Sequence, residues 1–347
     1  MKVYYSDSHH KHNPPYEVTE GGKHLPYLES PERVERILSA LGRAGWAEVL
    51  PPEDFGLEPI RAVHDPTYVE FLRTAFADWQ SEGGEHGLKD VGPVLIPAMF
   101  PPRRSRLRPA SLAGRAGYHS MDLAAPIIDG TFEAAVQAAH CALSAAKAVT
   151  GGERVAFALC RPPGHHAGRD YSGGYCYFNN ACIAAHDLAS LGKVAIFDFD
   201  YHAGNGTQDI FYESPEVLTI SIHADPARQY PSFLGYAAEA GAGAGLGFHR
   251  NYPLPPNVGD VEYLKTVDDA LTLIREFDPA SLVVSAGMDI YEGDPLGDFK
   301  VTTGGIRVIG ERLAALALPA VICMEGGYNN EALGENVAAF LSAFVQA

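Results

Sequence analysis

The sequence contains little cysteine. Only five of its 347 residues are cysteines, and no two of them form a CxxC pair. An odd number of cysteines in mostly apolar surroundings argues against a disulfide framework and against a thiolate zinc site. We therefore expect reduced thiols in the core at Cys141, Cys160, Cys176, Cys182 and Cys323.

Long apolar segments are also missing. No uninterrupted apolar run is long enough to span a bilayer, and the N-terminal MKVYYSDSHH turns polar too early for a secretory signal. These features predict a soluble protein of the cytoplasm. The GxSxG elbow that presents the nucleophile of many serine hydrolases is absent as well, which argues against that enzyme class.

Cationic residues are scarce relative to acidic ones. The chain has 26 Lys and Arg against 43 Asp and Glu, a formal net charge of -17. This balance disfavours binding to nucleic acid or to an anionic membrane and attracts cationic ligands, although it also serves solubility. The arginine-dense PPRRSRLRP at 101–109 is a local exception. We interpret it as a loop or an interface.

The first part of the chain is irregular. MKVYYS predicts an edge strand at residues 1–6, and Ser30 followed by Pro31 predicts the N-cap and first position of a helix. Residues 81–131 are rich in Gly, Pro and Arg and show no clean periodicity. We interpret them as an insertion within a single domain that spans residues 1–347.

The rest of the chain alternates helices with short, almost continuously apolar strands. This pattern indicates a parallel sheet that is covered by helices on both faces. The predicted helices cover residues 132–149, 178–190, 260–276, 305–316 and 330–345, and the predicted strands cover 155–160, 194–200, 217–223, 282–287 and 320–326.

Polar residues follow four of these strands. In open α/β sheets, ligands bind outside the carboxyl ends of the strands, where these ends meet along one edge. We therefore expect the four groups of residues to converge on one site. They are residues 161–166, the triplet Asp198, Asp200 and His202, then Asp289, and finally residues 325–328.

The triplet Asp198, Asp200 and His202 has the spacing of metal ligands. The three residues occupy alternate positions of a predicted extended segment, and a period of two directs their side chains to the same side. Two carboxylates and one imidazole can hold a divalent cation and leave a coordination position open, as a catalytic metal requires. A structural acidic cluster is equally compatible with the triplet alone, but Asp289 at the end of another strand favours a metal.

The adjacent pair His165 and His166 lies in CRPPGHHAGRDYSGGYC at 160–176. Two neighbouring imidazoles oppose each other's protonation, so their pairing indicates a site. One neutral imidazole can take the proton of a metal-bound water, and the second can tune the first with Asp198 as its carboxylate. Tyr328, after two glycines, can approach a ligand closely. Taken alone, it is interpreted as an ordinary loop tyrosine.

The other histidines receive no role. Lone residues such as His64, His140, His186 and His249 are interpreted as surface or satisfied core histidines. The N-terminal HHKH at 9–12 could bind stray metal, but it is better interpreted as exposed polar sequence.

Five motifs carry a family resemblance. RPPGHHA, DxDxHxGNGTQDIFY, SIHAD, SAGMDxxxxDPLG and MEGGY follow one another between residues 154 and 347, and MKVYYSDSH, SPERVERI and VHDPTYVEFL extend the match to the N-terminus. In this order they resemble the histone deacetylase superfamily and, within it, the bacterial acetylpolyamine amidohydrolases. The resemblance implies the arginase/deacetylase fold: one α/β domain around a mainly parallel eight-stranded sheet flanked by helices.

The resemblance also implies metal sites. Asp200, His202 and Asp289 match the zinc ligands of the family, with Fe(II) as the alternative metal. A structural potassium ion is implied at Asp198, Asp200, His202 and Ser221, largely through backbone carbonyls.

Catalytic roles are implied in the same way. His166 matches the general base and later acid, supported by Asn205, and His165 paired with Asp198 matches its electrostatic partner. Tyr328 matches the tyrosine that stabilises the oxyanion. The implied reaction is the zinc-dependent hydrolysis of an acetamide to acetate and a free amine.

The implied substrate is a small cationic acetylated amine, an acetylpolyamine. Tyr175 and Tyr230 match the walls of the acyl tunnel, and Glu17 matches an acid near its entrance that pairs with the distal ammonium. The insertion at 81–131 matches a loop that in this branch forms a homodimer and narrows the entrance.

Two positions depart from the family pattern. Ala203 stands where the family usually has a second histidine after the ligand, which leaves zinc binding intact but makes the potassium geometry less certain. Leu296 stands where one eukaryotic polyamine-specific branch has an acidic gatekeeper, so the selection of cations must come from other residues.

Three other functions stay open. The same chemistry could act on acetyl-lysine in peptides or on other small N-acyl amines. An arginase-like ureohydrolase with two manganese ions needs extra Asp and His ligands around the DxDxH segment, which we do not find. A non-catalytic binder of acetylated ligands could retain the fold, although the intact ligands, histidine pair and Tyr328 argue against it.

Overall fold

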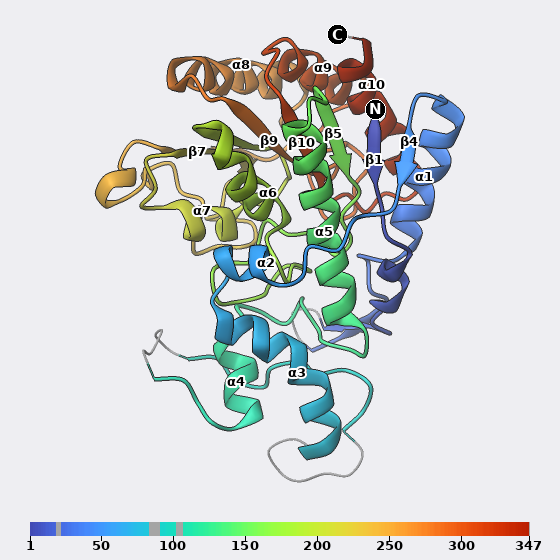
Figure 1. Ribbon diagram of the computed structural model, residues 1–347, viewed down its shortest axis with the longest axis vertical. Coiled ribbons are helices and arrows are strands. Elements are labelled where there is room, and N and C mark those ends of the chain that lie inside the picture. Colours follow the sequence, from blue (N-terminus) through green and yellow to red (C-terminus); the bar gives the residue numbers. More distant parts are fainter. Residues whose placement is uncertain (19–21, 83–90, 102–106, 347) are drawn as a thin grey trace.

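An eight-stranded sheet in which every pair of neighbours is parallel forms the centre of the molecule (Figure 1). The computed structural model describes residues 1–18, 22–82, 91–101 and 107–346. The strand order is β4-β1-β5-β10-β9-β6-β7-β8, and β2 pairs with β3 in a separate antiparallel ribbon. The strands are β1 Lys2–Tyr4, β2 Glu17–Val18, β3 His24–Leu25, β4 Glu48–Leu50, β5 Val155–Ala158, β6 Val194–Asp198, β7 Val217–Ala224, β8 His249–Leu254, β9 Ser281–Ala286 and β10 Ala320–Met324.

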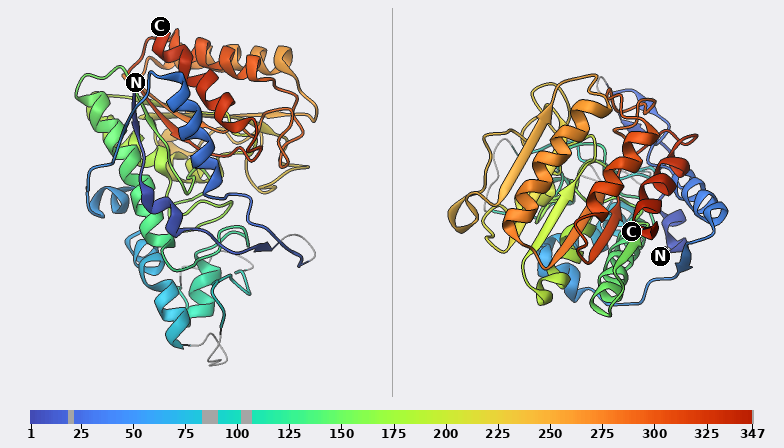
Figure 2. Two further views of the ribbon diagram at one scale, coloured as in Figure 1. Left: turned by 90° about the vertical axis from the view of Figure 1, so that its right-hand side faces the viewer. Right: turned by 90° about the horizontal axis from the view of Figure 1, so that it is seen from above.

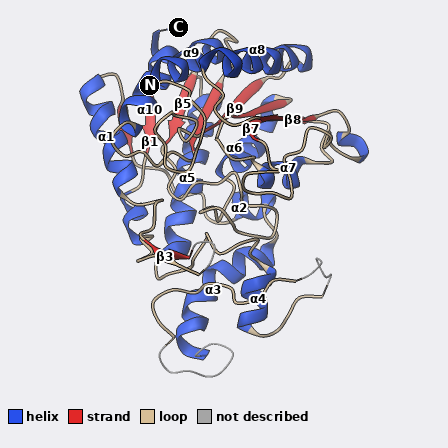
Figure 3. Ribbon diagram, turned by 180° about the vertical axis from the view of Figure 1, so that it is seen from behind, coloured by secondary structure: helices blue, strands red, loops and turns tan. Residues whose placement is uncertain are grey.

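Helices cover both faces of this sheet, as predicted (Figures 2 and 3). One cluster of buried side chains joins one face to α1, α8, α9 and α10, and the other joins the opposite face to α2, α3, α5 and α6. Within β6, Ala195 and Phe197 belong to the first cluster and Val194 and Ile196 to the second. Successive residues of a strand point to opposite faces, so a strand that is buried on both faces is apolar throughout. The helices are α1 Glu32–Ala44, α2 Glu58–Val63, α3 Pro66–Glu82, α4 Leu112–Tyr118, α5 Thr131–Thr150, α6 Asn180–Leu188, α7 Asn205–Phe211, α8 Asp260–Phe277, α9 Thr303–Ala314 and α10 Leu333–Gln346.

The regular second half of the chain confirms the predicted helices and strands to within a few residues at their ends. The first half corrects two expectations. β1 is not an edge strand, because the short β4 pairs on its outer side. Ser30 does not cap α1, because Pro31 occupies the N-cap position and the Ser30 carbonyl oxygen accepts a hydrogen bond from the Arg33 backbone N–H.

The predicted insertion is only partly described. Within residues 81–131, α4 packs near α3, and Leu95 pairs with Ile127 in an isolated bridge. Residues 83–90 and 102–106, and with them most of the arginine-dense segment, lie outside the described residues. Figure 1 places α3 and α4 beyond the carboxyl ends of β1, β4 and β5, on the same side as the loops that carry the polar residues.

The five cysteines are free and buried, as expected. Among the described residues, no helix combines the length and the apolar character that crossing a membrane requires.

His64 is a core histidine with a hydrogen-bond partner for each ring nitrogen, as expected. Its burial leads us to predict that the stability of the protein depends on pH. Its Nδ1 lies 2.9 Å from the Gly168 carbonyl oxygen, so it donates there, and its Nε2 accepts from the Asn179 backbone N–H at 2.9 Å. Burial lowers the pKa of His64 from 6.5 to about 4. Between these two values the unfolded chain binds a proton that the folded protein excludes. His64 therefore makes its full contribution to the free energy of unfolding above pH 6.5. This contribution falls by about 1.4 kcal/mol per pH unit as the pH is lowered towards 4.

We expect His64→Asn to make the free energy of unfolding less dependent on pH by about this slope, because asparagine cannot take up the proton. Urea denaturation at pH 6.5, 5.5 and 4.5 measures the slope. His186→Gln removes an exposed histidine from α6 and serves as the matched control. Equal slopes in wild type and His64→Asn would contradict the assignment.

Candidate active site

The loops after β5, β6, β9 and β10 meet at the carboxyl edge of the sheet, because these four strands are neighbours in the order β5-β10-β9-β6. The expected convergence of polar groups from distant parts of the chain is therefore found. β6 ends at Asp198, earlier than predicted, so that Asp200 and His202 lie in the loop that follows it.

Asp200, His202 and Asp289 form a compact cluster of metal-ligating side chains. His202 Nδ1 lies 3.3 Å from Asp200 Oδ1 and 3.2 Å from Asp289 Oδ2. The other oxygen of each carboxylate is held by a backbone N–H, since Gly326 donates to Asp200 Oδ2 and Tyr201 donates to Asp289 Oδ1, each at 2.8 Å. Both aspartates are fully buried. The cluster thus turns one oxygen of each carboxylate towards the imidazole.

This donor set fits a divalent cation. Burial and the neighbouring Asp200 charge raise the pKa of Asp289 to about 7. Burial alone would lower the pKa of His202, but hydrogen bonds to Asp200 and Asp289 raise it to about 9. Two buried carboxylates therefore require a positive charge between them, which a metal ion supplies. Glycine at 326 permits this spacing, because a Cβ there would lie 2.4 Å from Asp289 Oδ2.

The two adjacent histidines lie in different electrostatic environments. His165 Nδ1 is 3.0 Å from Asp198 Oδ2, and His166 Nδ1 is 2.7 Å from Asn205 Oδ1. Burial opposes the charging of His165, but Asp200 and Asp198 together raise its pKa well above the usual value. Burial and the charges of His165 and His202 lower the pKa of His166. His165 is therefore charged and His166 neutral, a division of roles typical of acid–base sites.

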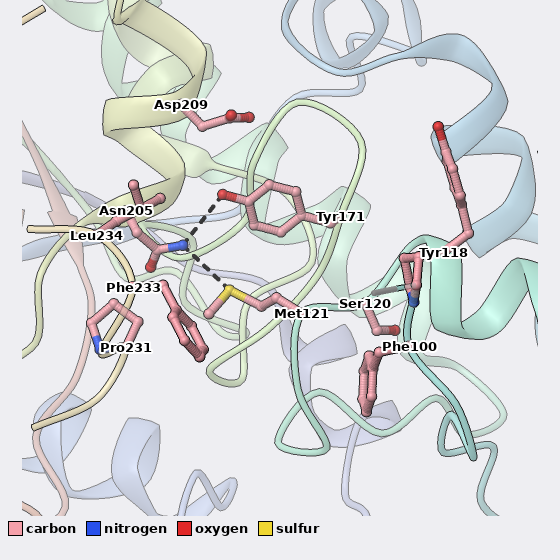
Figure 4. A pocket seen from close by; sticks show the side chains of 11 residues that line it. Phe100, Tyr118, Ser120, Met121, Tyr171, Asn205, Asp209, Pro231, Phe233 and Leu234 are labelled. Carbon is pink, nitrogen blue, oxygen red and sulfur yellow. Dashed lines mark hydrogen bonds between the residues drawn. The ribbon is translucent and has the colours of Figure 1, made fainter. Parts of the chain in front are cut away.

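Asn205, the first residue of α7, fixes the tautomer of His166. Its amide nitrogen donates to the Tyr171 hydroxyl and to Met121 Sδ, each at 3.3 Å (Figure 4). The amide oxygen must then face His166 Nδ1, which carries the proton, and the lone pair lies on His166 Nε2. Asn205 also lines a separate cavity of about 310 Å³. Figure 4 shows Phe100 and Phe233 among the side chains around it.

A second cavity, of about 190 Å³, opens onto the metal-ligating cluster. His166 and His202 line it together with Tyr175, Tyr230, Leu296 and Tyr328. Tyr175, which forms one wall of this cavity, has a backbone φ of 67°, in the left-handed region that aromatic residues rarely adopt. The surrounding structure must therefore hold its backbone in this strained conformation.

Two of the tyrosines that line this cavity donate hydrogen bonds to carboxylates. The Tyr175 hydroxyl donates to Glu17 Oε2 at 2.7 Å, and the Tyr230 hydroxyl donates to Asp122 Oδ2 at 2.6 Å. Glu17 is only 7% exposed and lies behind Tyr175, not on the surface of the cavity, and burial raises its pKa. The sequence offered no signal for Asp122, which comes from the irregular insertion.

Tyr328 lies in the cavity with its backbone held by a residue from another loop. Asp294 Oδ2 accepts hydrogen bonds from the backbone N–H groups of Tyr328 at 2.6 Å and Asn329 at 3.1 Å. Burial raises the pKa of the Tyr328 phenol although the Arg33 guanidinium, 5.0 Å from the ring centroid, opposes this. The phenol is therefore a hydrogen-bond donor at neutral pH. The DPLG motif contained Asp294, but sequence reasoning gave it no role.

Comparisons with known proteins agree with this arrangement. A family model described as the histone deacetylase domain matches residues 27–344. The chain belongs to the histone deacetylase family. The family consists of hydrolytic deacetylases that in general depend on a metal ion.

Three relatives of this histone deacetylase family member are informative. Acetylpolyamine amidohydrolase 2 of Pseudomonas aeruginosa is 42% identical over 99% of this chain and 98% of its own length. Acetylpolyamine amidohydrolase of Mycoplana ramosa is 42% identical over 97% and 98%, respectively. A crystal structure of acetylpolyamine aminohydrolase from Burkholderia pseudomallei superimposes with a TM-score of 0.94 at 40% identity and covers 99% of this chain and 98% of that chain.

Glu325 is a further residue to which sequence reasoning gave no role of its own. It is fully buried, and its Oε2 accepts from the backbone N–H groups of Gly164 at 2.7 Å and His165 at 3.1 Å. Its Oε1 accepts from the Ser285 hydroxyl at 3.2 Å. In this member of the family, Glu325 thus joins the loop of the histidine pair to β9 and to the loop of Tyr328.

The position of Ala203 explains how the chain accommodates its departure from the family pattern. Ala203 is buried against the backbone of Gly235. A Cβ added to Gly235 would lie only 2.6 Å from the Cβ of Ala203. His223 fills the neighbouring space and lies 2.8 Å from the Gly235 carbonyl oxygen and 2.7 Å from Ser221 Oγ. Ser221 is in register with Asp198 on the adjacent strand. The potassium site at these strand ends stays a prediction.

Proposed function

We propose that this histone deacetylase family member is a zinc-dependent amidohydrolase that converts N-acetylated polyamines to acetate and free amines. The observation that carries the proposal is a single cavity lined by a neutral His166, a protonated Tyr328 and the metal-ligating His202. The names of the three relatives support the substrate class.

Asp200, His202 and Asp289 would hold the zinc ion through two carboxylate oxygens and the imidazole nitrogen. Iron(II) is the alternative, since a site with one imidazole and two carboxylates also suits that ion. When bound, the ion polarises the acetamide carbonyl and acidifies the attacking water. A structural potassium ion at Asp198, Asp200, His202 and Ser221 belongs to the same proposal.

His166 moves the proton of the reaction. Asn205 keeps the Nδ1 proton in place, so that Nε2 takes the proton of the attacking water as its oxygen bonds to the carbonyl carbon. His165 remains charged beside Asp198 and lowers the proton affinity of His166, which then delivers the proton to the nitrogen as the C–N bond breaks. The Tyr328 hydroxyl donates a hydrogen bond to the oxyanion that develops in between.

The cavity of about 190 Å³, which serves as the substrate tunnel in this proposal, favours the binding of a slender cationic chain. Its two aromatic walls accept an alkyl segment, and the carboxylates of Glu17 and Asp122 behind them place negative charge close to the path of a distal ammonium. The net charge of -17 acts in the same direction. The nearest alternative keeps the chemistry and acts on acetyl-lysine peptides or other small N-acyl amines.

The test is a panel of substrates on zinc-loaded protein. We expect Glu17→Gln to lower kcat/KM for N-acetylputrescine by up to about 10-fold, because the carboxylate lies behind Tyr175 and attracts the distal ammonium at a distance and not through a direct contact. The same variant should leave kcat/KM for N-butylacetamide nearly unchanged, since that substrate has no distal ammonium and glutamine can still accept from Tyr175.

Glu276→Gln, which removes an exposed carboxylate from α8, is the matched control. Equal losses on both substrates would show that Glu17 only supports the wall. A higher kcat/KM of the wild type on an acetyl-lysine peptide than on N-acetylputrescine would replace the substrate class.

The proposal includes a homodimer in the cytoplasm. The domain spans residues 1–347, and the insertion at 81–131 would contact a second copy and narrow the tunnel entrance. In support, α3 and α4 project from the sheet on the side of the site (Figure 1), and Phe100 and Phe233 beside the larger cavity are 42% and 88% exposed. A narrow entrance would exclude folded proteins as substrates.

A further inference from the structure

A second cluster of metal-ligating side chains lies near the N-terminus, away from the candidate active site. The short 3-10 helix Asp7–Lys11 follows β1 and carries Asp7, His9 and His10. One ligand atom from each of these three residues lies within 4.8 Å of those from the other two. The expectation that HHKH is exposed was wrong for two of its residues, since His9 is 3% exposed and His12 is fully buried.

His9 is the unusual member of this cluster. Neither nitrogen of its buried ring has a hydrogen-bond partner in the part of the chain that the structure describes. Leaving a buried polar group unpaired costs about 1–3 kcal/mol, so such a group in a folded protein calls for a ligand. Burial, together with the charges of Arg161 and His10, lowers the pKa of His9 to about 3, so the ring is neutral and keeps a free lone pair. The Arg161 charge is balanced by Glu29, whose Oε1 lies 3.0 Å from Arg161 Nε.

His10 and Asp7 have the supporting contacts of metal ligands. His10 Nε2 lies 2.8 Å from Glu35 Oε1 on α1, which favours a proton on Nε2. His10 Nδ1 faces two oxygens of Asp7, the backbone carbonyl oxygen at 3.2 Å and the carboxylate Oδ1 at 3.5 Å. A carboxylate that accepts from the far nitrogen of a metal-bound histidine is the usual second partner of such a ligand. The Tyr5 hydroxyl donates to Asp7 Oδ1 at 2.8 Å and orients this carboxylate in turn.

We propose that Asp7, His9 and His10 form a second transition-metal site that takes zinc or a similar divalent ion. Two imidazoles and one carboxylate are ligands that zinc accepts, with water completing the coordination. The bound ion satisfies His9 and, through Glu35, ties the 3-10 helix to α1. The carbonyl oxygen of His9 also accepts from Arg161, which lies in the loop that carries the histidine pair, so the ion supports this loop from behind. The site does not depend on the proposed reaction.

Metal counting tests the proposal on the full chain. Protein is equilibrated with buffered free Zn²⁺, freed of excess metal, and analysed for zinc per chain and for its Tm. We expect two zinc ions per wild-type chain, one in Asp7→Asn and one in His10→Gln, each with a lower Tm than wild type at the same free Zn²⁺. These two variants are chosen because Asp7 and His10 are exposed and their replacement leaves the core intact.

His186→Gln, which removes an exposed histidine elsewhere, should keep two ions. Deacetylase activity of the two variants should remain, which separates this site from the active site. The same number of zinc ions in the wild-type chain and in both variants would overturn the proposal, whatever the occupancy of the active site.

Discussion

Replacing His166 by alanine is expected to lower kcat for an acetylated amine by about 10²–10⁴-fold, the usual contribution of a general acid–base residue. The size of the effect follows from the double use that we propose for this imidazole, which would take a proton from water and return it to the leaving amine. No other side chain of the cavity can replace it, because Tyr328 is protonated and His202 faces the carboxylates of Asp200 and Asp289.

The measurement is steady-state kinetics together with the zinc content of the same preparation. His166→Ala should keep the metal, because His166 is not among the three residues proposed as its ligands. Asp289→Asn should lose metal and activity together, which distinguishes loss of the base from loss of the site. His186→Ala on the surface of α6 is the control for histidine removal. A His166→Ala protein that holds zinc and retains more than about one tenth of the activity would contradict the assignment.

The parallel sheet and the position of the site could be predicted because both follow from local patterns. Strands such as β6 are apolar throughout, since both faces are covered, and a polar residue at the end of such a strand stands out. The carboxyl ends of neighbouring parallel strands meet at one edge, so Asp200 and Asp289 could be placed together although they are 89 positions apart in the numbering. Their roles came from the ordered motifs, which local patterns alone do not assign.

The contacts that orient the site could not be predicted, because they join loops whose paths the sequence does not define. Asp294 meets the backbone of Tyr328 across 34 residues, and Glu325 meets Gly164 across 161. Each of these acids has the pattern of an ordinary loop or strand-end carboxylate. What distinguishes them is burial together with two or three N–H or O–H donors, which is a property of the folded chain.

The prediction for the N-terminal segment at 9–12 was wrong for a similar reason. HHKH has the composition of exposed sequence, yet α5 covers His12, whose Nδ1 lies 3.0 Å from the Thr131 hydroxyl, 119 residues away. β4 was missed because it has only three residues and they are mostly exposed, so that it lacks the apolar pattern of the central strands. Pairing with β1 along its backbone, not side-chain burial, makes it a strand.

The Tyr328→Phe substitution is expected to reduce kcat by about 10²–10³-fold with little change in KM, because in the proposed reaction the hydroxyl bonds to an oxyanion that exists only during the reaction. Burial raises the pKa of this phenol, so the loss should be the same at pH 7 and pH 8. Tyr212→Phe, at the end of α7, is the matched control. A loss that appears in KM alone would mean that Tyr328 binds the substrate without acting on the transition state.

A substitution of Asp294 tests whether the position of the Tyr328 hydroxyl matters, because Asp294 holds the backbone of Tyr328. Asp294→Asn turns an amide group towards one of the backbone N–H donors that now meet a carboxylate, and so loosens Tyr328, Asn329 or Leu296. A misplaced hydroxyl should cost up to about 10²-fold in kcat. If Asp294 acts through the position of that hydroxyl, the double variant with Tyr328→Phe should be no slower than Tyr328→Phe alone. The same loss in both backgrounds would instead assign Asp294 to the general stability of the loop.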